Sequence, residues 1–193
     1  ASGNEAIERA RFLIDASGLA NLTANRASLR DYYQGHKKIA IFNHFSHVAM
    51  PQGEEFGDIL IIRRANSWFW LIPLSAERTS VGLVMDKVDF PALGKTPGEV
   101  FDDAVASTPA VRERFANAAA EMPPQVAVDF SYRNRSLVSP RVVRAGDAAG
   151  FIDPVFSSGV MLAMTSGRDA SRVVDEALRL DQAMTSGMKR YET

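Results

Sequence analysis

An apolar segment that ends in an acid and leads through a turn into a helical pattern constrains the fold more than any other feature. Residues 141–147 read RVVRAGD, and residues 148–158 bring the small and turn-forming residues AAGFIDPVFSS. Within them, Asp153 before Pro154 predicts an extended turn. From residue 159 to about 180, small and apolar residues recur at steps of three or four, which is typical of a helix. A strand, a turn and a helix are therefore predicted in succession.

The acid and the start of this helix are candidates for ligand contacts. Asp147 follows the predicted strand, and in α/β folds ligands bind beyond the carboxyl ends of strands. Ser158 and Gly159 open the helix with little bulk, so that unpaired backbone N–H groups can approach an anion or an electron-rich oxygen. A purely structural interpretation fits equally well: a carboxylate that holds a turn and a serine that caps a helix. The residues alone leave both interpretations open.

The rest of the chain alternates strand-like and helix-like segments. Four runs rich in β-branched and aromatic residues lie between residues 38 and 89, and the residues SAER predict a tight hairpin between the last two. Thr96, Pro97 and Glu99 have the spacing of a capped helix start, which predicts a helix to about residue 106. A second helix is expected over residues 110–120, and strands over 11–15 (buried), 125–136 and 141–145. Strands gathered first with helices on one side indicate an α/β or α+β fold.

Composition excludes several classes of protein. A net charge of −1 gives no electrostatic argument for binding nucleic acid or an anionic membrane. No apolar run approaches the roughly 20 residues that cross a bilayer, and no signal-peptide pattern opens the chain. The absence of cysteine excludes disulfides and thiolate metal sites and fits a cytoplasmic protein. We therefore expect a cytoplasmic protein without nucleic-acid or membrane partners.

Two other groups of polar residues carry weaker interpretations. His44 and His47 lie three apart on a predicted strand, so they point to opposite faces and cannot bind one metal ion together; no metal site is expected. Arg133 and Arg135 share a strand face and can meet an anion, although a solvated sheet face explains them better.

Residues 68–73, which read WFWLIP, form a second motif. As a strand, they place Trp68, Trp70 and Ile72 on one face and the intervening residues on the other. A strand buried on both faces, with the tryptophans in the core, explains this pattern without any function.

Together the two motifs resemble those of the flavin-dependent halogenases, which belong with flavoprotein monooxygenases and geranylgeranyl-reductase-like enzymes. Residues 68–73 match the W-x-W-x-I-P motif of that family. Residues 146–160 resemble its carboxyl-terminal FAD signature, in a form similar to the phenol- and pyrrole-halogenating branch. The resemblance covers about residues 11–191.

The resemblance implies a glutathione-reductase-type FAD/substrate domain, with an antiparallel-rich sheet and packed helices. Over residues 1–193, it implies that 37–136 form the substrate side and that 1–36 and 137–193 form the FAD side.

The resemblance also implies roles for individual residues. Asp147 is expected to contact the ribityl chain of FAD, and the amides around Gly159 and Val160 are expected to face the flavin pyrimidine edge. Ser158 together with Gly159 is expected to hold a halide ion.

Other residues are implied to lie near the cofactor. Residues 12–18, FLIDASG, are similar to the family's strand and turn near the dinucleotide, which makes Asp15 and Gly18 weaker FAD-side candidates. The motif residues expected near the flavin are Trp68, Trp70, Ile72 and Pro73.

The chain also departs from the family pattern. It has no G-x-G-x-x-G fingerprint for the FAD pyrophosphate, and none of its lysines lies in a motif that matches the family's catalytic lysine. We therefore assign no catalytic residue. We expect a piece of a larger enzyme that is incomplete at both ends and lacks the N-terminal Rossmann unit. In isolation, it is expected to bind FAD weakly and to be inactive.

The implied function of the whole enzyme is halogenation of an electron-rich aromatic compound, free or bound to a carrier protein. The reaction uses reduced FAD (FADH2), oxygen and a halide, and a separate flavin reductase supplies the reduced FAD. Two alternatives stay open: an FAD-dependent monooxygenase or geranylgeranyl-reductase-like oxidoreductase, and an inactive folded remnant that serves as a binding module.

Overall fold

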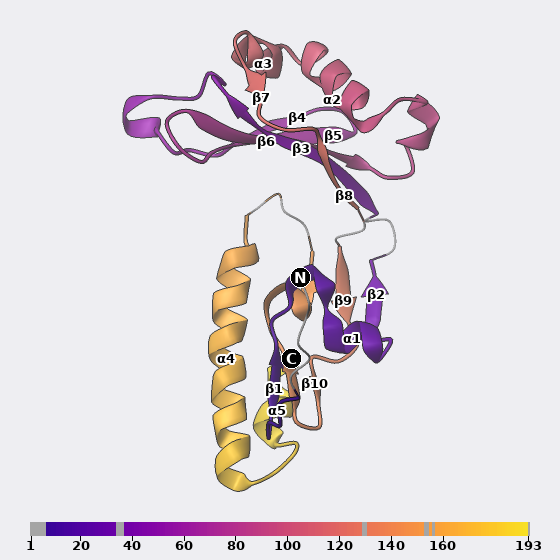
Figure 1. Cartoon of the computed structure of the whole chain (residues 1–193), viewed down its shortest axis with the longest axis vertical. Coiled ribbons are helices and arrows are strands. Elements are labelled where there is room, and N and C mark those ends of the chain that lie inside the picture. Colours follow the sequence, from indigo (N-terminus) through magenta and orange to yellow (C-terminus); the bar gives the residue numbers. More distant parts are fainter. Residues whose placement is uncertain (1–6, 34–36, 129–130, 153–154, 156, 193) are drawn as a thin grey trace. The chain divides into compact units, whose positions relative to one another are not determined.

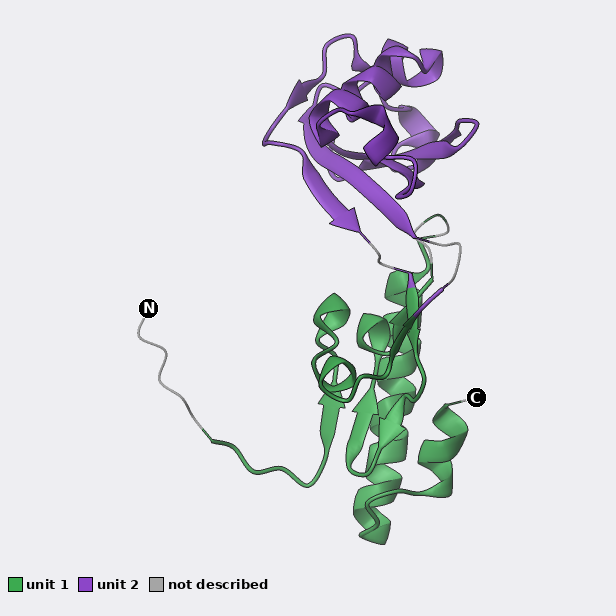
Figure 2. Ribbon diagram, turned by 90° about the vertical axis from the view of Figure 1, so that its right-hand side faces the viewer, with its two compact units in different colours: residues 1–31, 132–193 green, residues 32–131 purple. Residues whose placement is uncertain are grey.

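The chain forms two compact units. The computed structural model describes residues 7–33, 37–128, 131–152, 155 and 157–192 (Figure 1). The discontinuous unit contains residues 1–31 and 132–193, and the inserted unit contains residues 32–131 (Figure 2). The turn expected at Asp153–Pro154 lies outside the described residues.

The inserted unit is built on a six-stranded sheet in which all the paired strands are antiparallel. Its strand order is β4–β5–β6–β3–β7, and β8 also pairs with β3. The strands are β3 (Lys38–Ser46), β4 (Leu60–Arg63), β5 (Ser67–Pro73), β6 (Arg78–Asp86), β7 (Ala119–Ala120) and β8 (Gln125–Val128). The predicted hairpin between β5 and β6 is confirmed, because the Leu74 N–H donates to the Arg78 carbonyl across 2.8 Å.

Helices cover one face of this sheet (Figure 1). Phe69 and Leu71 on β5 are fully buried and belong to the same hydrophobic core as Phe101 on α2 (Pro97–Ala106). A residue of α3 (Pro109–Arg112) also belongs to this core. The rings of Phe69 and Phe101 meet edge to face, with centroids 5.8 Å apart. Trp68 and Trp70 lie on the opposite face and are only half-buried, so the alternation predicted for this strand is confirmed.

The helices of the inserted unit were predicted with unequal success. The start of α2 is confirmed: the Thr96 hydroxyl accepts from the Glu99 N–H at 3.4 Å, and the Glu99 carboxylate accepts from the Thr96 N–H at 2.8 Å. The second helix expected over residues 110–120 is wrong. Helix α3 ends at Arg112, a 3-10 turn follows, and β7 pairs with the edge of β3. Alanine-rich sequence favours a helix, but here strand pairing prevails.

Loss of the α2 cap is expected to destabilise the protein modestly. Thr96→Ala removes the hydroxyl that accepts from the first turn, which lowers the free energy of unfolding by about 1 kcal/mol. Urea denaturation would measure this change. Thr165→Ala, at an exposed position within α4, is the control and is expected to change stability by less than about 0.5 kcal/mol. If Thr96→Ala and Thr165→Ala lowered the free energy of unfolding equally, the capping role of Thr96 would be contradicted.

The discontinuous unit contains two small sheets and the longest helix. In one sheet, β1 (Leu13–Asp15) pairs in parallel with β11 (Val142–Arg144), which pairs antiparallel with β10 (Val138–Ser139). The other sheet has the order β12–β9–β2, and its strands are β12 (Gly150–Phe151), β9 (Tyr132–Asn134) and β2 (Arg30–Tyr32). The helices are α1 (Leu22–Arg26), α4 (Gly159–Leu180) and α5 (Ser186–Tyr191).

The core of this unit forms where α4 packs on the first sheet. Ala170, Val174 and Ala177 are the buried residues of α4, and they share a cluster with Val143 of β11 and Met188 of α5. The predicted helix over residues 159–180 is therefore confirmed. No helix in the described ranges has the length and apolar character that a membrane crossing requires.

Two strand predictions need correction. The strand at residues 11–15 was expected to be buried, but Leu13 and Ile14 are 50% and 40% exposed, and only Asp15 is buried. The single strand expected over residues 125–136 is two strands, β8 and β9, which belong to different sheets.

Candidate functional site

Parallel pairing brings two distant segments of the chain to one sheet edge. Asp15 on β1 is in register with Arg144 on β11. Because the strands run in the same direction, the residues that follow each of them emerge at the same edge. Gly18 follows β1 and Asp147 follows β11, so the discontinuous unit places these two candidates beside each other.

A cavity of about 440 Å³ opens at this edge, and we call it the strand-end cavity. Its walls come from β1 and its turn, from the residues after β11, and from the first turns of α4. Four of the predicted site residues line it: Gly18, Asp147, Gly159 and Val160. Asp15 and Ser158 do not line it.

Asp147 presents an acceptor to this cavity. Its side chain is half-buried, and burial raises the pKa of its carboxyl. Within the described ranges, no hydrogen bond or ion pair reaches the carboxylate. A partly desolvated carboxylate without a donor is unfavourable, so a ligand with hydroxyl or N–H groups would stabilise it.

Hydrogen bonds from buried side chains fix the backbone around Asp147. The Tyr132 hydroxyl donates to the Asp147 carbonyl, and the Asn134 side chain donates to the Ala148 carbonyl across 2.8 Å. Asn21 in turn donates to Asn134 across 2.8 Å. These contacts fix the turn from which the carboxylate projects.

The solvated face predicted for Arg133 and Arg135 is confirmed, and the opposite face of the same segment supplies this support. Arg133 and Arg135 are exposed, and Arg135 forms an ion pair with Asp31 at 2.8 Å. Tyr132 and Asn134 alternate with them and are 1% and 7% exposed. The period of two was visible in the sequence, but only the fold shows which face meets the turn.

Asp15 supports the turn after β1. Its two carboxylate oxygens accept four hydrogen bonds, from the N–H and hydroxyl groups of Ser17 and Thr23, at 2.6 to 3.0 Å. Burial opposes the ionisation of Asp15, but these hydrogen bonds outweigh it and lower the pKa to about 2. In the structure, Asp15 therefore orders the segment that carries Gly18.

This low pKa predicts acid sensitivity. Because the folded protein favours ionised Asp15, its stabilising contribution is complete above the ordinary pKa of 3.8 and is lost as the pH falls towards 2. Asp15→Asn is expected to lower the free energy of unfolding by about 2 kcal/mol at pH 6, and the difference from the unmodified protein shrinks between pH 4 and pH 2. Urea denaturation across this range would measure it. Asp102→Asn, at an exposed position, is the control. If the difference in the free energy of unfolding between Asp15→Asn and the unmodified protein did not change with pH, the low pKa of Asp15 would be contradicted.

Among the described residues, no side chain caps the start of α4. The N-cap residue Ser158 makes no capping hydrogen bond, and the first turn holds no acidic residue. The N–H groups of Gly159 and Val160 are in the first turn, where helices have no internal acceptors. The positive end of a 22-residue helix thus adjoins the strand-end cavity and favours an anion or a carbonyl oxygen there.

Close approach explains the glycine that precedes Asp147. Gly146 has φ +59°, and a Cβ there would lie 3.3 Å from the Ala163 Cβ on α4. Its N–H donates to the Ser166 hydroxyl across 2.8 Å, which ties the turn to the helix.

The tryptophan motif lies on the face of the inserted unit's sheet that lacks helices. The ring centroids of Trp68 and Trp70 are 6.0 Å apart, and the ring centroid of Phe42 lies 5.9 Å from that of Trp70. The Trp70 indole N–H donates to the Ser80 hydroxyl across 3.2 Å. Ile72 and Pro73 are also half-buried on β5. The four motif residues belong to one unit, and the residues of the strand-end cavity belong to the other.

His44 and His47 lie at different kinds of backbone position. His44 lies on β3, and His47 follows the end of that strand in the left-handed region, with φ 57°. Across the described ranges, no group of three or more histidine or acidic side chains is arranged to hold a metal ion.

Comparison with known proteins places these features in a family. The profile of the family described as tryptophan halogenase matches residues 2–190. The chain is 31% identical to a 1H-pyrrole-2-carbonyl peptidyl-carrier-protein chlorinase of Pseudomonas fluorescens, over 98% of this chain and 44% of that protein. It is also 31% identical to a tryptophan 2-halogenase of Chondromyces crocatus, over 94% of this chain and 35% of that protein.

Solved structures show the same similarity. The flavin-dependent brominase Bmp2 matches 99% of this chain and 49% of its own chain, with a TM-score of 0.91 and 27% identity. The chain thus spans less than half the length of the relatives that it matches.

Proposed function

The chain belongs to the flavin-dependent halogenase family, and we propose from this that the whole protein halogenates an electron-rich aromatic compound with reduced FAD, oxygen and a halide. The observation that carries the proposal is the strand-end cavity, where the Asp147 carboxylate and the start of a long helix meet, both without a side-chain partner among the described residues. We also propose that Gly18, Asp147, Gly159 and Val160, which line this cavity, bind the cofactor and that Asp15 supports them by ordering the turn that carries Gly18.

The residues of this cavity fit the part of FAD that they are proposed to hold. The Asp147 carboxylate lacks a donor within the described residues, and ribityl hydroxyl groups are donors of the required kind. The N–H groups of Gly159 and Val160 suit carbonyl oxygens of a flavin ring. A Cβ at Gly167, which also lines the cavity, would meet nothing within 4 Å, so there is open space beside the helix.

The protein's contribution is to hold and orient the reactants. Bound FAD supplies the oxygen-activating chemistry. We propose that Asp147 fixes the ribityl chain and that the first turn of α4 stabilises negative charge on the ring. Ser158 and Gly159 are proposed to hold the halide at this helix end, which is favourable for an anion.

We propose that the tryptophan motif shields this chemistry from water. The half-buried rings of Trp68 and Trp70 form an apolar wall on the helix-free face of their sheet. Ile72 extends this wall along β5, and Pro73 ends the strand. Exclusion of water would disfavour side reactions of the oxidised halogen.

Two relatives act on a pyrrole carried by a peptidyl carrier protein, as their names state. We propose a phenol or pyrrole substrate, free or carrier-bound, and a separate flavin reductase as the source of reduced FAD.

The proposal is tested with the full-length protein, a flavin reductase and NADH. Phloroglucinol and a carrier-bound pyrrole-2-carboxylate serve as substrates, with chloride or bromide added or omitted, and products are analysed by mass spectrometry. A product whose halogen isotope pattern follows the added halide is the expected result. A hydroxylated product formed without halide would instead indicate a monooxygenase. Flavin binding without any product from either substrate would contradict the proposed substrate class.

A further inference from the structure

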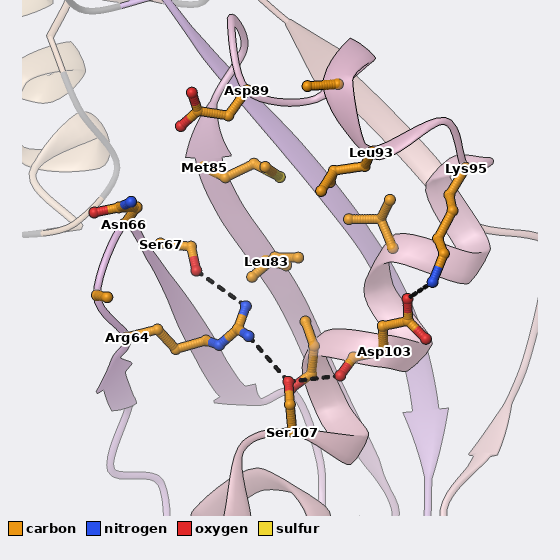
Figure 3. Close-up of a pocket in the computed structure, with 14 residues that line it drawn as sticks. Arg64, Asn66, Ser67, Leu83, Met85, Asp89, Leu93, Lys95, Asp103 and Ser107 are labelled. Carbon is orange, nitrogen blue, oxygen red and sulfur yellow. Dashed lines mark hydrogen bonds and ion pairs between the residues drawn. The ribbon is translucent and has the colours of Figure 1, made fainter.

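A second cavity lies within the inserted unit, away from the tryptophan motif. It has a volume of about 670 Å³, and we call it the helix-side cavity. It is enclosed by the turn between β4 and β5, by β6, by residues 89–95 and by α2 (Figure 3). No residue of the tryptophan motif lines it, so the flavin proposal does not assign it a role.

The floor of the helix-side cavity is apolar and reaches the core. Leu83 and Val100 are 1% and 5% exposed, and Met85 and Leu93 extend the apolar surface towards the rim. Figure 3 shows Leu83 and Met85 between the polar groups of the walls. A ligand with an apolar body can therefore displace water from this floor, which is favourable in proportion to the area covered.

Arg64 supplies a cation with spare hydrogen-bonding capacity. Its guanidinium donates to two neutral hydroxyls, those of Ser67 at 3.1 Å and Ser107 at 3.0 Å. No acidic side chain pairs with Arg64 in the part of the chain that the structure describes. A guanidinium has five N–H donors, so most of them remain available. Ser107 ends α2, and the negative end of that helix offsets only part of the charge.

The other charged groups of the cavity limit the charge of the ligand. Lys95 is already paired with Asp103, and the pairing raises the pKa of Lys95. Asp89 lines the cavity without any resolved partner of its side chain among the described residues. Arg64 and Asp89 thus each lack an ion-pair partner among the described residues, so Arg64 can pair with one carboxylate, while Asp89 and Asp103 would repel a second negative group on a ligand.

We propose that the helix-side cavity binds a small organic monocarboxylate, whose carboxylate pairs with Arg64 and whose apolar body covers Leu83 and Met85. A carboxylate matches the planar donor pattern of a guanidinium, and such pairs are stronger than hydrogen bonds between neutral groups. This site is independent of the flavin, so the proposal stands or falls separately from the halogenase activity.

The test is titration of the full-length protein with sodium octanoate, followed by calorimetry. Saturable binding is expected, and Arg64→Gln is expected to weaken it at least tenfold. Arg63→Gln is the matched control, because Arg63 is an adjacent exposed arginine that does not line the cavity. Suberate has the same chain length but a second carboxylate, and octylamine carries the opposite charge. Both are expected to bind at least tenfold more weakly than octanoate.

A second variant keeps the proposal falsifiable if Arg64→Gln is poorly folded. Leu93→Glu places a negative group at a position that is 45% exposed, so the fold should tolerate it, and octanoate binding is expected to weaken at least tenfold. The proposal is overturned if octanoate shows no saturable binding, if Arg63→Gln weakens binding as much as Arg64→Gln, or if suberate and octanoate bind equally.

Discussion

Removal of the Asp147 carboxylate from the full-length protein is expected to weaken FAD binding about 10- to 100-fold. The reason is that Asp147→Ala deletes a charged acceptor that the described part of the protein leaves without a donor. Burial raises the pKa of this carboxyl, which means that the folded state disfavours its ionised form. The substitution should therefore leave thermal stability unchanged or slightly increased at neutral pH. Titration monitored by flavin fluorescence measures the affinity, and a melting curve without flavin measures the stability.

This pair of readouts separates a ligand contact from a structural role. Asp175→Ala, on the exposed part of α4, is the control and should change neither quantity. A loss of affinity accompanied by an equal loss of stability would mean that Asp147 holds its turn rather than the cofactor. Unchanged FAD affinity in Asp147→Ala would remove the central residue of the proposed site.

A methyl group at Gly82 is expected to destabilise the inserted unit by about 1–3 kcal/mol. A Cβ at this position would lie 2.2 Å from the Cζ2 atom of Trp70, so the indole must move. The ring cannot move freely, because Ser80 accepts its N–H and Phe42 packs beside it. Gly82→Ala should therefore lower the free energy of unfolding in urea and alter the tryptophan fluorescence of the folded protein.

A double-mutant cycle tests whether the indole is the cause. In a Trp70→Leu background, Gly82→Ala should cost about 1 kcal/mol less than in the unmodified protein, because the obstacle has been removed. Gly98→Ala is the control, since its Cβ would make an ordinary contact with Pro124 at 3.5 Å. Additive effects of the Gly82 and Trp70 substitutions would show that the strain lies elsewhere on β6.

Sequence patterns predicted those elements that are specified by neighbouring residues. The capping residues Thr96 and Glu99 determine where α2 begins, and the residues SAER form the predicted hairpin. The alternation along β5 correctly separated Phe69 and Leu71 from the tryptophans. Each of these features depends on interactions within a few residues, so it can be predicted from the local sequence.

Features that depend on distant pairing were not predictable in this way. Nothing local shows that β1 lies parallel to β11 or that the Asn134 amide supports the turn of Asp147. The same limit explains why the sequence predicts a helix at Ala119 and Ala120, because only pairing with the edge of β3 makes them a strand. The candidate site was therefore predicted as two separate segments, and pairing of these strands brings them to one cavity.

The insertion of residues 32–131 between the two parts of the discontinuous unit affects the order in which the protein is made. Strand β1 leaves the ribosome on the order of ten seconds before its partner β11 is synthesised. During that interval, the apolar side chains of Leu13 and Ile14 are without β11, and the strands of the inserted unit are synthesised. Among the described strands, β1 thus waits longest for its partner, and a chaperone would be most useful for the residues around it.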